Sequence, residues 1–251
     1  MLREKTVFGP IHSRRLGNSL GLNILPENGK FCNFDCIYCE CGWNKDGKDD
    51  QYLPKAYEVK VALEAKLKEC AQNGTPIDSI TFSGDGESTL NPDFPQIVDD
   101  TMALRDQYFP HAQVSILSNG TRAHIPAVFG ALGRVDKPIM KIDAPAKEWI
   151  AKINRPAPGY DVQRVIDALK QFKGDFILQT MMLQSGDFDS ASPEIVNPWM
   201  DIVRELRPRE IMVYTIDRPT PQEGLVKFSE EKMRQLVQPL IDEGFNIQIR
   251  G

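Results

Sequence analysis

Short apolar runs alternate with amphipathic helical patterns along the chain, and this alternation constrains the fold more than any other sequence feature. The apolar runs are short enough to be strands, and the segments between them carry apolar side chains at the three- and four-residue spacing of half-buried helices. Such an alternation implies parallel strands joined by right-handed crossovers, with the helices outside the sheet. The sequence therefore predicts an α/β fold of about six or seven β–α units, a partial (β/α)6-type TIM-like barrel with parallel strands.

The positions of the elements follow from periodicity and from residues that start or stop them. The predicted strands cover residues 19–25, 78–83, 113–117, 139–143, 176–183, 210–216 and 245–250. The predicted helices cover residues 54–73, 94–108, 123–132, a segment capped by Asp161 and stopped by Gly174, residues 198–206, and a last segment capped by Ser229. Pro239 lies inside the last helix, which predicts a kink there.

Length and charge limit the class of protein. A chain of 251 residues that is 41% hydrophobic suits a single domain over residues 1–251, and two small domains are compatible with this length but not required. The net charge of -5 gives no overall attraction to nucleic acid or anionic membrane, which disfavours a nucleic-acid partner without excluding one. No apolar run approaches the ~20 residues of a membrane span, and the first ten residues lack the apolar core of a secretory signal. These features predict a cytoplasmic protein with no membrane partner.

Four of the five cysteines lie between residues 32 and 41, a clustering that indicates metal or redox chemistry in a reducing compartment. Cys32, Cys36 and Cys39 have the spacing C-x3-C-x2-C. Three thiolates on one loop can hold three corners of a [4Fe-4S] cluster and leave the fourth iron open, as cleavage of S-adenosylmethionine (SAM) requires. We interpret Cys41 as a bystander or a reactive thiol, and Cys70 as a core residue of a helix.

A zinc site on Cys32, Cys36, Cys39 and Cys41 is the alternative. Zinc sites favour a C-x2-C pair with a second pair or histidines farther along the chain. The sequence has no second pair, and His12 and His111 are isolated. The spacing therefore favours the cluster, and zinc stays open.

The motif resembles that of radical SAM enzymes, in which an aromatic residue, here Tyr38, precedes the last cysteine. The segment GPIHSRRLG at residues 9–17, followed by Ser19-Leu20-Gly21, is similar to the small iron–sulfur oxidoreductases related to the wybutosine-synthesis tRNA enzyme. The resemblance implies a [4Fe-4S] cluster on the three cysteines, with Tyr38 beside the adenine of SAM. It also implies reductive cleavage to methionine and a 5′-deoxyadenosyl radical that takes hydrogen from a substrate. A low-potential electron donor such as flavodoxin or ferredoxin is implied as well.

Polar residues at the ends of the predicted strands are further candidates, because such ends carry the chemistry in parallel α/β folds. Lys141 and Asp143 lie two residues apart and therefore share one face of their strand. The apolar Met140 and Ile142 occupy the other face, toward the helices, so the charged pair is expected to face the inside of the barrel. We predict that this pair is catalytic. Relatives such as the activating enzyme of pyruvate formate-lyase carry a similar inward pair. The residues predicted to bind SAM, besides Tyr38, are Asp85, Gly86, Glu87, Ser118, Asn119 and Gln179.

Substrate contacts are predicted for Arg155, Tyr214 and Arg218, since an arginine at a strand end can bind a carboxylate or phosphate. Arg14 and Arg15 are predicted to line the mouth of the barrel, and His12 to lie near the cluster. A solvated surface role is open for each of these arginines.

The reaction that follows SAM cleavage has several open alternatives. Condensation of pyruvate onto tRNA is disfavoured, because Cys41 and Cys70 cannot supply three more ligands for a second cluster. Activation of a partner enzyme by making a glycyl radical on it fits the small size of the chain. Chemistry on a small molecule or peptide is a third option. A non-enzymatic zinc or redox-sensing module would leave Asp85, Gly86, Glu87 and the Lys141/Asp143 pair unexplained.

Overall fold

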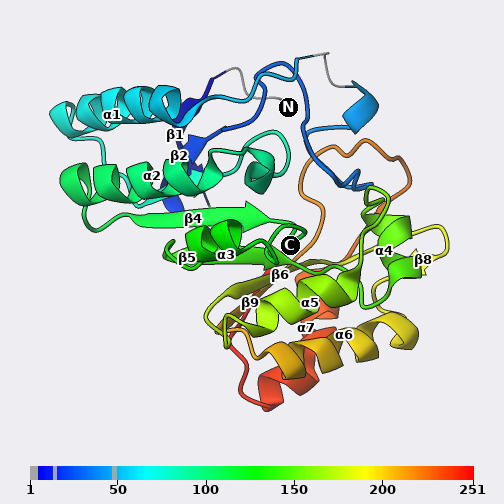
Figure 1. The fold of residues 1–251 in the computed structure, drawn as a ribbon. Helices are drawn as coiled ribbons and strands as arrows, with labels where there is room; N and C mark the ends of the chain where they lie inside the picture. The colour runs from blue at the N-terminus through cyan, green and yellow to red at the C-terminus, as the bar shows by residue number, and fades with distance from the viewer. Residues whose placement is uncertain (1–4, 14–15, 47–49) are drawn as a thin grey trace. The chain divides into compact units, whose positions relative to one another are not determined.

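The computed structural model describes residues 5–13, 16–46 and 50–251, and the chain divides into two compact units (Figure 1). The first unit comprises residues 1–32, 44–118 and 125–138, and the second comprises residues 33–43, 119–124 and 139–251. Arg14 and Arg15, predicted at the mouth of the barrel, lie outside the described residues. No helix in the described ranges is long and apolar enough to span a membrane.

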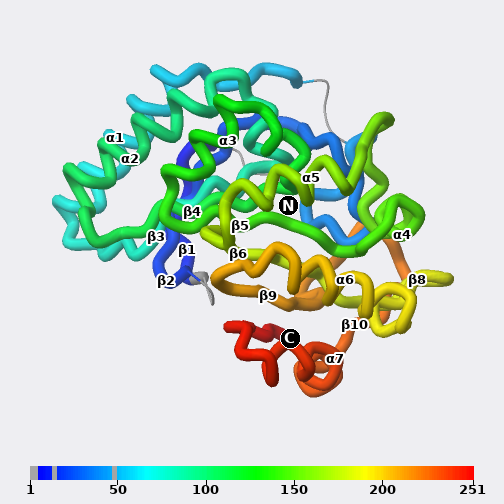
Figure 2. The backbone as a smooth tube through the Cα atoms, turned by 60° about the horizontal axis from the view of Figure 1, so that its bottom comes forward, coloured from blue at the N-terminus to red at the C-terminus, as the bar shows by residue number. Residues whose placement is uncertain are grey.

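The first unit is a set of strands with helices packed beside them. Its elements are β1 (Val7–Ser13), β2 (Gly17–Leu22), η1 (Asn44–Asp46), α1 (Ala56–Gln72), β3 (Ser79–Phe82), η2 (Ser88–Leu90), α2 (Phe94–Tyr108), β4 (Gln113–Ser118) and α3 (Pro126–Leu132). The strand order is β1-β2-β3-β4, with β1 antiparallel to β2 and the others parallel. The helices α1 and α2 lie side by side, as Figures 1 and 2 show.

The second unit carries the rest of the α/β pattern. Its elements are α4 (Lys147–Ile153), α5 (Val162–Lys170), β6 (Ile177–Met181), β7 (Leu183–Ser185), β8 (Phe188–Asp189), α6 (Pro193–Leu206), β9 (Glu210–Tyr214), β10 (Val226–Lys227), α7 (Glu230–Asp242) and β11 (Ile247–Arg250). The strand β5 (Lys137–Lys141) begins in the first unit and ends in this one. The parallel order is β5-β6-β9-β11, and β10, β7 and β8 form a separate antiparallel sheet.

Buried side chains follow the predicted periodicity. In α1 the buried residues are Val59, Leu63, Leu67 and Cys70, as the three- and four-residue spacing predicts. In β3 all four residues are buried, which is typical of a parallel strand covered on both faces. One face of the first unit's strands is polar: the hydroxyls of Ser19, Ser79, Thr81 and Ser115 form a hydrogen-bonded chain across β2, β3 and β4, with oxygen–oxygen distances of 2.8 to 3.2 Å.

Several elements differ from the predictions. The strand β1 and the short helix α4 were not expected, nor were β7, β8 and β10. The strands β2 and β6 end earlier than predicted, and α6 begins at Pro193 rather than at residue 198. Proline is favoured in the first turn of a helix, where its missing N–H costs nothing, and Pro193 takes that place while Pro198 lies inside the helix.

Candidate functional site

The loop that carries Cys36 and Cys39 is fixed to the end of α4 within the second unit. The backbone N–H of Ile37 donates to the carbonyl of Ile153 at 3.0 Å, and that of Asp35 to the carbonyl of Asn154 at 2.9 Å. The last carbonyls of a helix lack partners inside the helix, so the loop supplies them. A turn follows, in which the N–H of Cys39 donates to the carbonyl of Cys36 at 3.1 Å, so both thiols are held on one compact stretch.

The thiol of Cys36 is buried in polar surroundings. Burial raises its pKa to about 11, while the positive charge of Lys141 and a hydrogen bond from Asn154 act in the opposite direction. The Nδ2 atom of Asn154 lies 3.4 Å from the Cys36 Sγ. The amide and the cation each favour a thiolate, but burial outweighs them and the net pKa is raised. The amide donor is the feature of these surroundings that suits a sulfur bound to iron. All five cysteines carry thiols rather than disulfides.

Asp143 lies just beyond β5, and its carboxylate is the centre of a buried hydrogen-bond network. Its side chain is fully buried. One oxygen, Oδ1, accepts from the backbone N–H of Met181 at 2.8 Å. The other, Oδ2, accepts from the hydroxyl of Tyr38 and, at 2.6 Å, from the Nδ2 of Asn154. Burial of the tyrosine and the charge of Asp143 raise the pKa of Tyr38 well above its usual value. Tyr38 therefore stays protonated and donates a hydrogen bond to the carboxylate.

Lys141 completes this network through hydroxyl groups. Its Nζ lies 2.9 Å from the Tyr38 hydroxyl and 2.6 Å from the Tyr214 hydroxyl, but 3.9 Å from the Asp143 Oδ2. Burial opposes the charged amine, yet the charges of Asp143 and the contact with Tyr214 raise its pKa above the usual value, so Lys141 stays cationic. Four predicted site residues, Tyr38, Lys141, Asp143 and Tyr214, therefore lie together; Asp143 is buried, and the side chain of Lys141 is partly buried.

In the first unit, the segment after β3 pairs with the start of the cysteine loop. The N–H of Phe31 donates to the carbonyl of Asp85 at 2.8 Å, and the N–H of Glu87 donates to the carbonyl of Phe31 at 3.0 Å. Gly86 has a φ of 143°, and a Cβ built on it would lie 1.9 Å from the Phe31 oxygen. Only glycine allows this approach. The glycine thus has a structural reason to be there besides the predicted contact with SAM.

Glu87 and Ser118 also come together in the first unit. The Glu87 Oε1 accepts from the Ser118 hydroxyl at 2.9 Å and from the N–H and hydroxyl of Thr89 at 3.1 and 2.6 Å. The carboxylate therefore joins the end of β4 to the turn η2. Both residues are buried, with 2% and 5% exposure.

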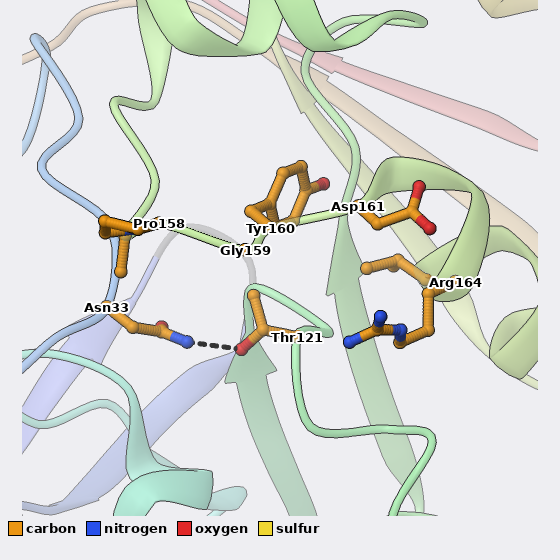
Figure 3. Close-up of a pocket in the computed structure, with 9 residues that line it drawn as sticks. Asn33, Thr121, Pro158, Gly159, Tyr160, Asp161 and Arg164 are labelled. Atoms are coloured by element: carbon orange, nitrogen blue, oxygen red, sulfur yellow. Dashed lines mark hydrogen bonds between the residues drawn. The ribbon is translucent and has the colours of Figure 1, made fainter.

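Asn119 takes part in a second polar group, which borders a cavity of about 140 Å3 in the second unit (Figure 3). The Nδ2 of Asn119 donates to the Asn33 Oδ1 at 2.7 Å, and the Nδ2 of Asn33 donates to the Thr121 hydroxyl at 2.8 Å. Tyr160 and Arg164 line the same cavity. Burial raises the pKa of Tyr160, and its ring packs edge-on against Phe34 at 5.2 Å between centroids.

The two arginines predicted to contact substrate lie against the cysteine loop. The guanidinium of Arg155 lies 4.7 Å from the centre of the Trp43 ring and donates to the Gln222 Oε1 at 2.8 Å. Arg218 donates to the Glu40 carboxylate at 2.8 Å. Both arginines are exposed and contact residues of the loop that carries Cys36 and Cys39. A substrate role for them stays a prediction.

The remaining predicted residues are placed as follows. Gln179 is 3% exposed on β6, Cys70 is 2% exposed in α1, and His12 is exposed on β1. Cys32 belongs to the first unit, whereas Cys36 and Cys39 belong to the second. Within the described ranges, no three or more His, Cys, Asp or Glu side chains form a group that could hold a single metal ion.

Asn154 is the functional candidate that the sequence did not reveal. It contacts Cys36, Tyr38 and Asp143, yet only its neighbour Arg155 was predicted to act. Asn154 was missed because it lies at the end of α4. That seven-residue helix has no side-chain cap and too few turns to give a periodic signal in the sequence.

Comparison with known proteins shows a family. A family model described as the Radical SAM superfamily matches residues 29–197, well over half of the chain. A curated protein of Brachyspira hyodysenteriae named GTPase Obg is 30% identical over 238 residues, which are 93% of this chain and 33% of that protein. A UPF0026 protein of Methanocaldococcus jannaschii is 30% identical over 227 residues, which are 88% of this chain and 66% of that protein. The chain thus spans less than two thirds of the length of these relatives.

Solved structures share the fold. A radical SAM methyltransferase from Sphaerobacter thermophilus gives a TM-score of 0.68 at 16% identity, over 92% of this chain and 66% of its own. SuiB from Streptococcus suis, solved bound to SAM, gives a TM-score of 0.64 at 15% identity, over 89% of this chain and 49% of its own. These likenesses confirm the predicted α/β fold class, and the family match confirms the resemblance read from the cysteine motif. The chain belongs to the radical SAM superfamily.

Proposed function

We propose that this radical SAM enzyme holds a [4Fe-4S] cluster on Cys32, Cys36 and Cys39 and uses it to cleave SAM. Membership of the superfamily makes the chain an enzyme with two cofactors, SAM and an iron–sulfur cluster. The observation that carries the assignment to these cysteines is the C-x3-C-x2-C motif within the matched residues 29–197. Together the cofactors supply one-electron reductive cleavage of SAM to methionine and a 5′-deoxyadenosyl radical, which takes hydrogen from a substrate.

In this proposal the residues of the chain bind the cluster and SAM and position the reacting groups. The Asn154 amide next to the Cys36 sulfur supports a ligand role for Cys36, because such donors stabilise a sulfur bound to metal. Lys141 and Asp143 are held in fixed positions by Tyr38, Tyr214 and Asn154, and we assign to this pair the contact with the reacting part of SAM or substrate. The strand-end residues Asp85, Gly86, Glu87, Ser118, Asn119 and Gln179 are assigned to SAM.

The partners belong to the proposal too. A radical SAM enzyme needs a reductant and a substrate, and we propose flavodoxin or ferredoxin as the reductant. A thiolate-bound cluster needs a reducing compartment, which favours the cytoplasm. We also propose that residues 1–251 act as a single radical SAM domain. Arg155, Tyr214 and Arg218 are the substrate contacts proposed.

The experiment is anaerobic reconstitution with iron and sulfide, followed by incubation with SAM and dithionite and an assay for 5′-deoxyadenosine. We expect product from the parent chain and none from Cys36→Ala, together with iron and sulfide rather than zinc in the reconstituted protein. A parent chain that assembles the cluster and forms no 5′-deoxyadenosine, with or without candidate substrates, would contradict the proposal. Zinc in place of iron and sulfide would favour the non-enzymatic module instead.

A further inference from the structure

Asn154 lies at the end of α4 with one side-chain nitrogen among three polar groups. The residue is 2% exposed. Its Nδ2 is 2.6 Å from the Asp143 Oδ2, 3.1 Å from the Tyr38 hydroxyl and 3.4 Å from the Cys36 Sγ. All four residues belong to the second unit. The amide is therefore the group that joins a predicted cluster ligand to the buried carboxylate.

The two hydrogens of this amide have three acceptors within reach. One is donated to Asp143, whose carboxylate is the closest and is charged. The Tyr38 oxygen already receives a hydrogen from Lys141 at 2.9 Å, and its own hydrogen is donated to Asp143. The second amide hydrogen lies between the Tyr38 oxygen, 3.1 Å from the Nδ2, and the Cys36 sulfur, 3.4 Å from it. Once Cys36 ligates iron as a thiolate, the anionic sulfur is the stronger acceptor of the two.

The backbone of Asn154 holds the amide in this place. Its N–H donates to the Ile150 carbonyl at 2.8 Å inside α4, and its carbonyl accepts from the N–H of Asp35 at 2.9 Å in the cysteine loop. The same residue therefore ends the helix, anchors the loop and directs a donor at the thiol. Because its backbone is fixed on both sides, Asn154 loses little further conformational freedom when its side chain makes the bond.

We propose that Asn154 is a positioning residue that donates a hydrogen bond to the Cys36 thiolate and thereby raises the reduction potential of the cluster. A hydrogen bond to a ligating sulfur stabilises the state with the extra electron more than the oxidised state, so losing it makes reduction harder. The inference rests on the proposed function, because it needs Cys36 to be a cluster ligand. The electron comes from an external low-potential donor, and no bond within the chain changes.

The test compares Asn154→Leu with the parent in a redox titration with dithionite, followed by electron paramagnetic resonance of the reduced cluster. We expect the midpoint potential of Asn154→Leu to be more negative than that of the parent, beyond the scatter of replicate titrations. Asn91→Leu is the matched control. Asn91 is also 2% exposed, and its amide donates to the carbonyls of Ile24 and Pro54 at 2.8 and 3.0 Å, so its loss costs stability and leaves the potential unchanged.

A second comparison separates the hydrogen bond from the charge of Asp143. The substitution Asn154→Leu is repeated in an Asp143→Asn background, which also avoids leaving a buried carboxylate with one donor fewer and so favours folding. The same direction of shift in this background supports a direct bond to Cys36. The inference is overturned if Asn154→Leu shifts the midpoint potential only when Asp143 is present, or if it leaves the potential unchanged in both backgrounds. Either result leaves the proposed function intact. A parent chain that assembles no cluster overturns both.

Discussion

At the scale of single residues, the charges of Lys141 and Asp143 are linked through one shared hydroxyl, that of Tyr38. The distance of 3.9 Å between Nζ and Oδ2 is long for a direct bond, while Tyr38 lies between them and contacts both. Buried charges are costly unless each is paired and hydrogen-bonded. The pair should therefore behave as a unit in which removal of both charges costs less than the sum of the two single removals.

A double-mutant cycle tests this coupling. Lys141→Met leaves the Asp143 carboxylate buried without its cation, and we expect a loss of about 3 kcal/mol in the free energy of unfolding. Asp143→Asn should cost a similar amount, and the double variant should cost less than the sum by at least ~1 kcal/mol. Urea unfolding of the metal-free protein measures all three. Additive losses would show that the two charges are stabilised independently.

Gly86 makes a second prediction at this scale. An alanine there would place its Cβ 1.9 Å from the Phe31 oxygen and would also have to adopt a φ of 143°. We expect Gly86→Ala to lose at least ~3 kcal/mol of unfolding free energy, from backbone strain and overpacking together. Gly74→Ala is the control, because its φ of 64° is also positive but no atom lies within 4 Å of the added carbon. That variant should lose about 1 kcal/mol, and equal losses would contradict the role given to Phe31.

At the scale of elements, long periodic segments could be predicted from the sequence and short or interrupted ones could not. Residues 94–108 were predicted as a helix and are α2. The strand β1 was missed because Gly9 and Pro10 interrupt its pattern, and proline is tolerated there since β1 lies at the edge of the sheet. The residues of the candidate site also fall into those that the sequence predicts and those that it does not. Strand-end residues such as Lys141 and Asp143 were found because parallel strands gather such ends, whereas Asn154 follows a helix too short to predict.

Helix caps give a prediction that belongs to the elements. Ser192 and Ser229 both precede a helix, but only Ser229 accepts a hydrogen bond from the first turn, from the N–H of Lys232 at 3.1 Å. We expect Ser229→Ala to lower the free energy of unfolding by about 1 kcal/mol. Ser192→Ala should change it by only a few tenths of that, since α6 begins with Pro193 and gains no side-chain bond. Denaturant midpoints at equal m-values distinguish the two, and a larger loss for Ser192→Ala would refute the assignment of the caps.

At the scale of the whole molecule, the family match extends over residues 29–197 and so includes parts of both units. That membership supports the general reaction proposed above, but it does not indicate the substrate. Arg155 and Arg218 illustrate why. The sequence marks them as anion-binding residues at the ends of elements, yet in the fold they contact Trp43 and Glu40 of the cysteine loop. Substrate contacts depend on loop conformations, which periodicity and spacing do not encode.

Cluster content is the property of the whole chain that best separates ligands from bystanders among the cysteines. A [4Fe-4S] cluster on three thiolates should give about four iron and four sulfide per chain after reconstitution. Cys39→Ala removes one of three ligands, and we expect most of the iron and sulfide to be lost, together with the thermal stabilisation that binding gives the native state. Cys41 lies two residues after Cys39, outside the C-x3-C-x2-C spacing. The variant Cys41→Ala should therefore retain the parent's iron, sulfide and melting temperature. If Cys41→Ala instead lost metal as Cys39→Ala does, Cys41 would be a ligand, and the four-thiolate alternative would replace the site-open cluster on which SAM cleavage depends.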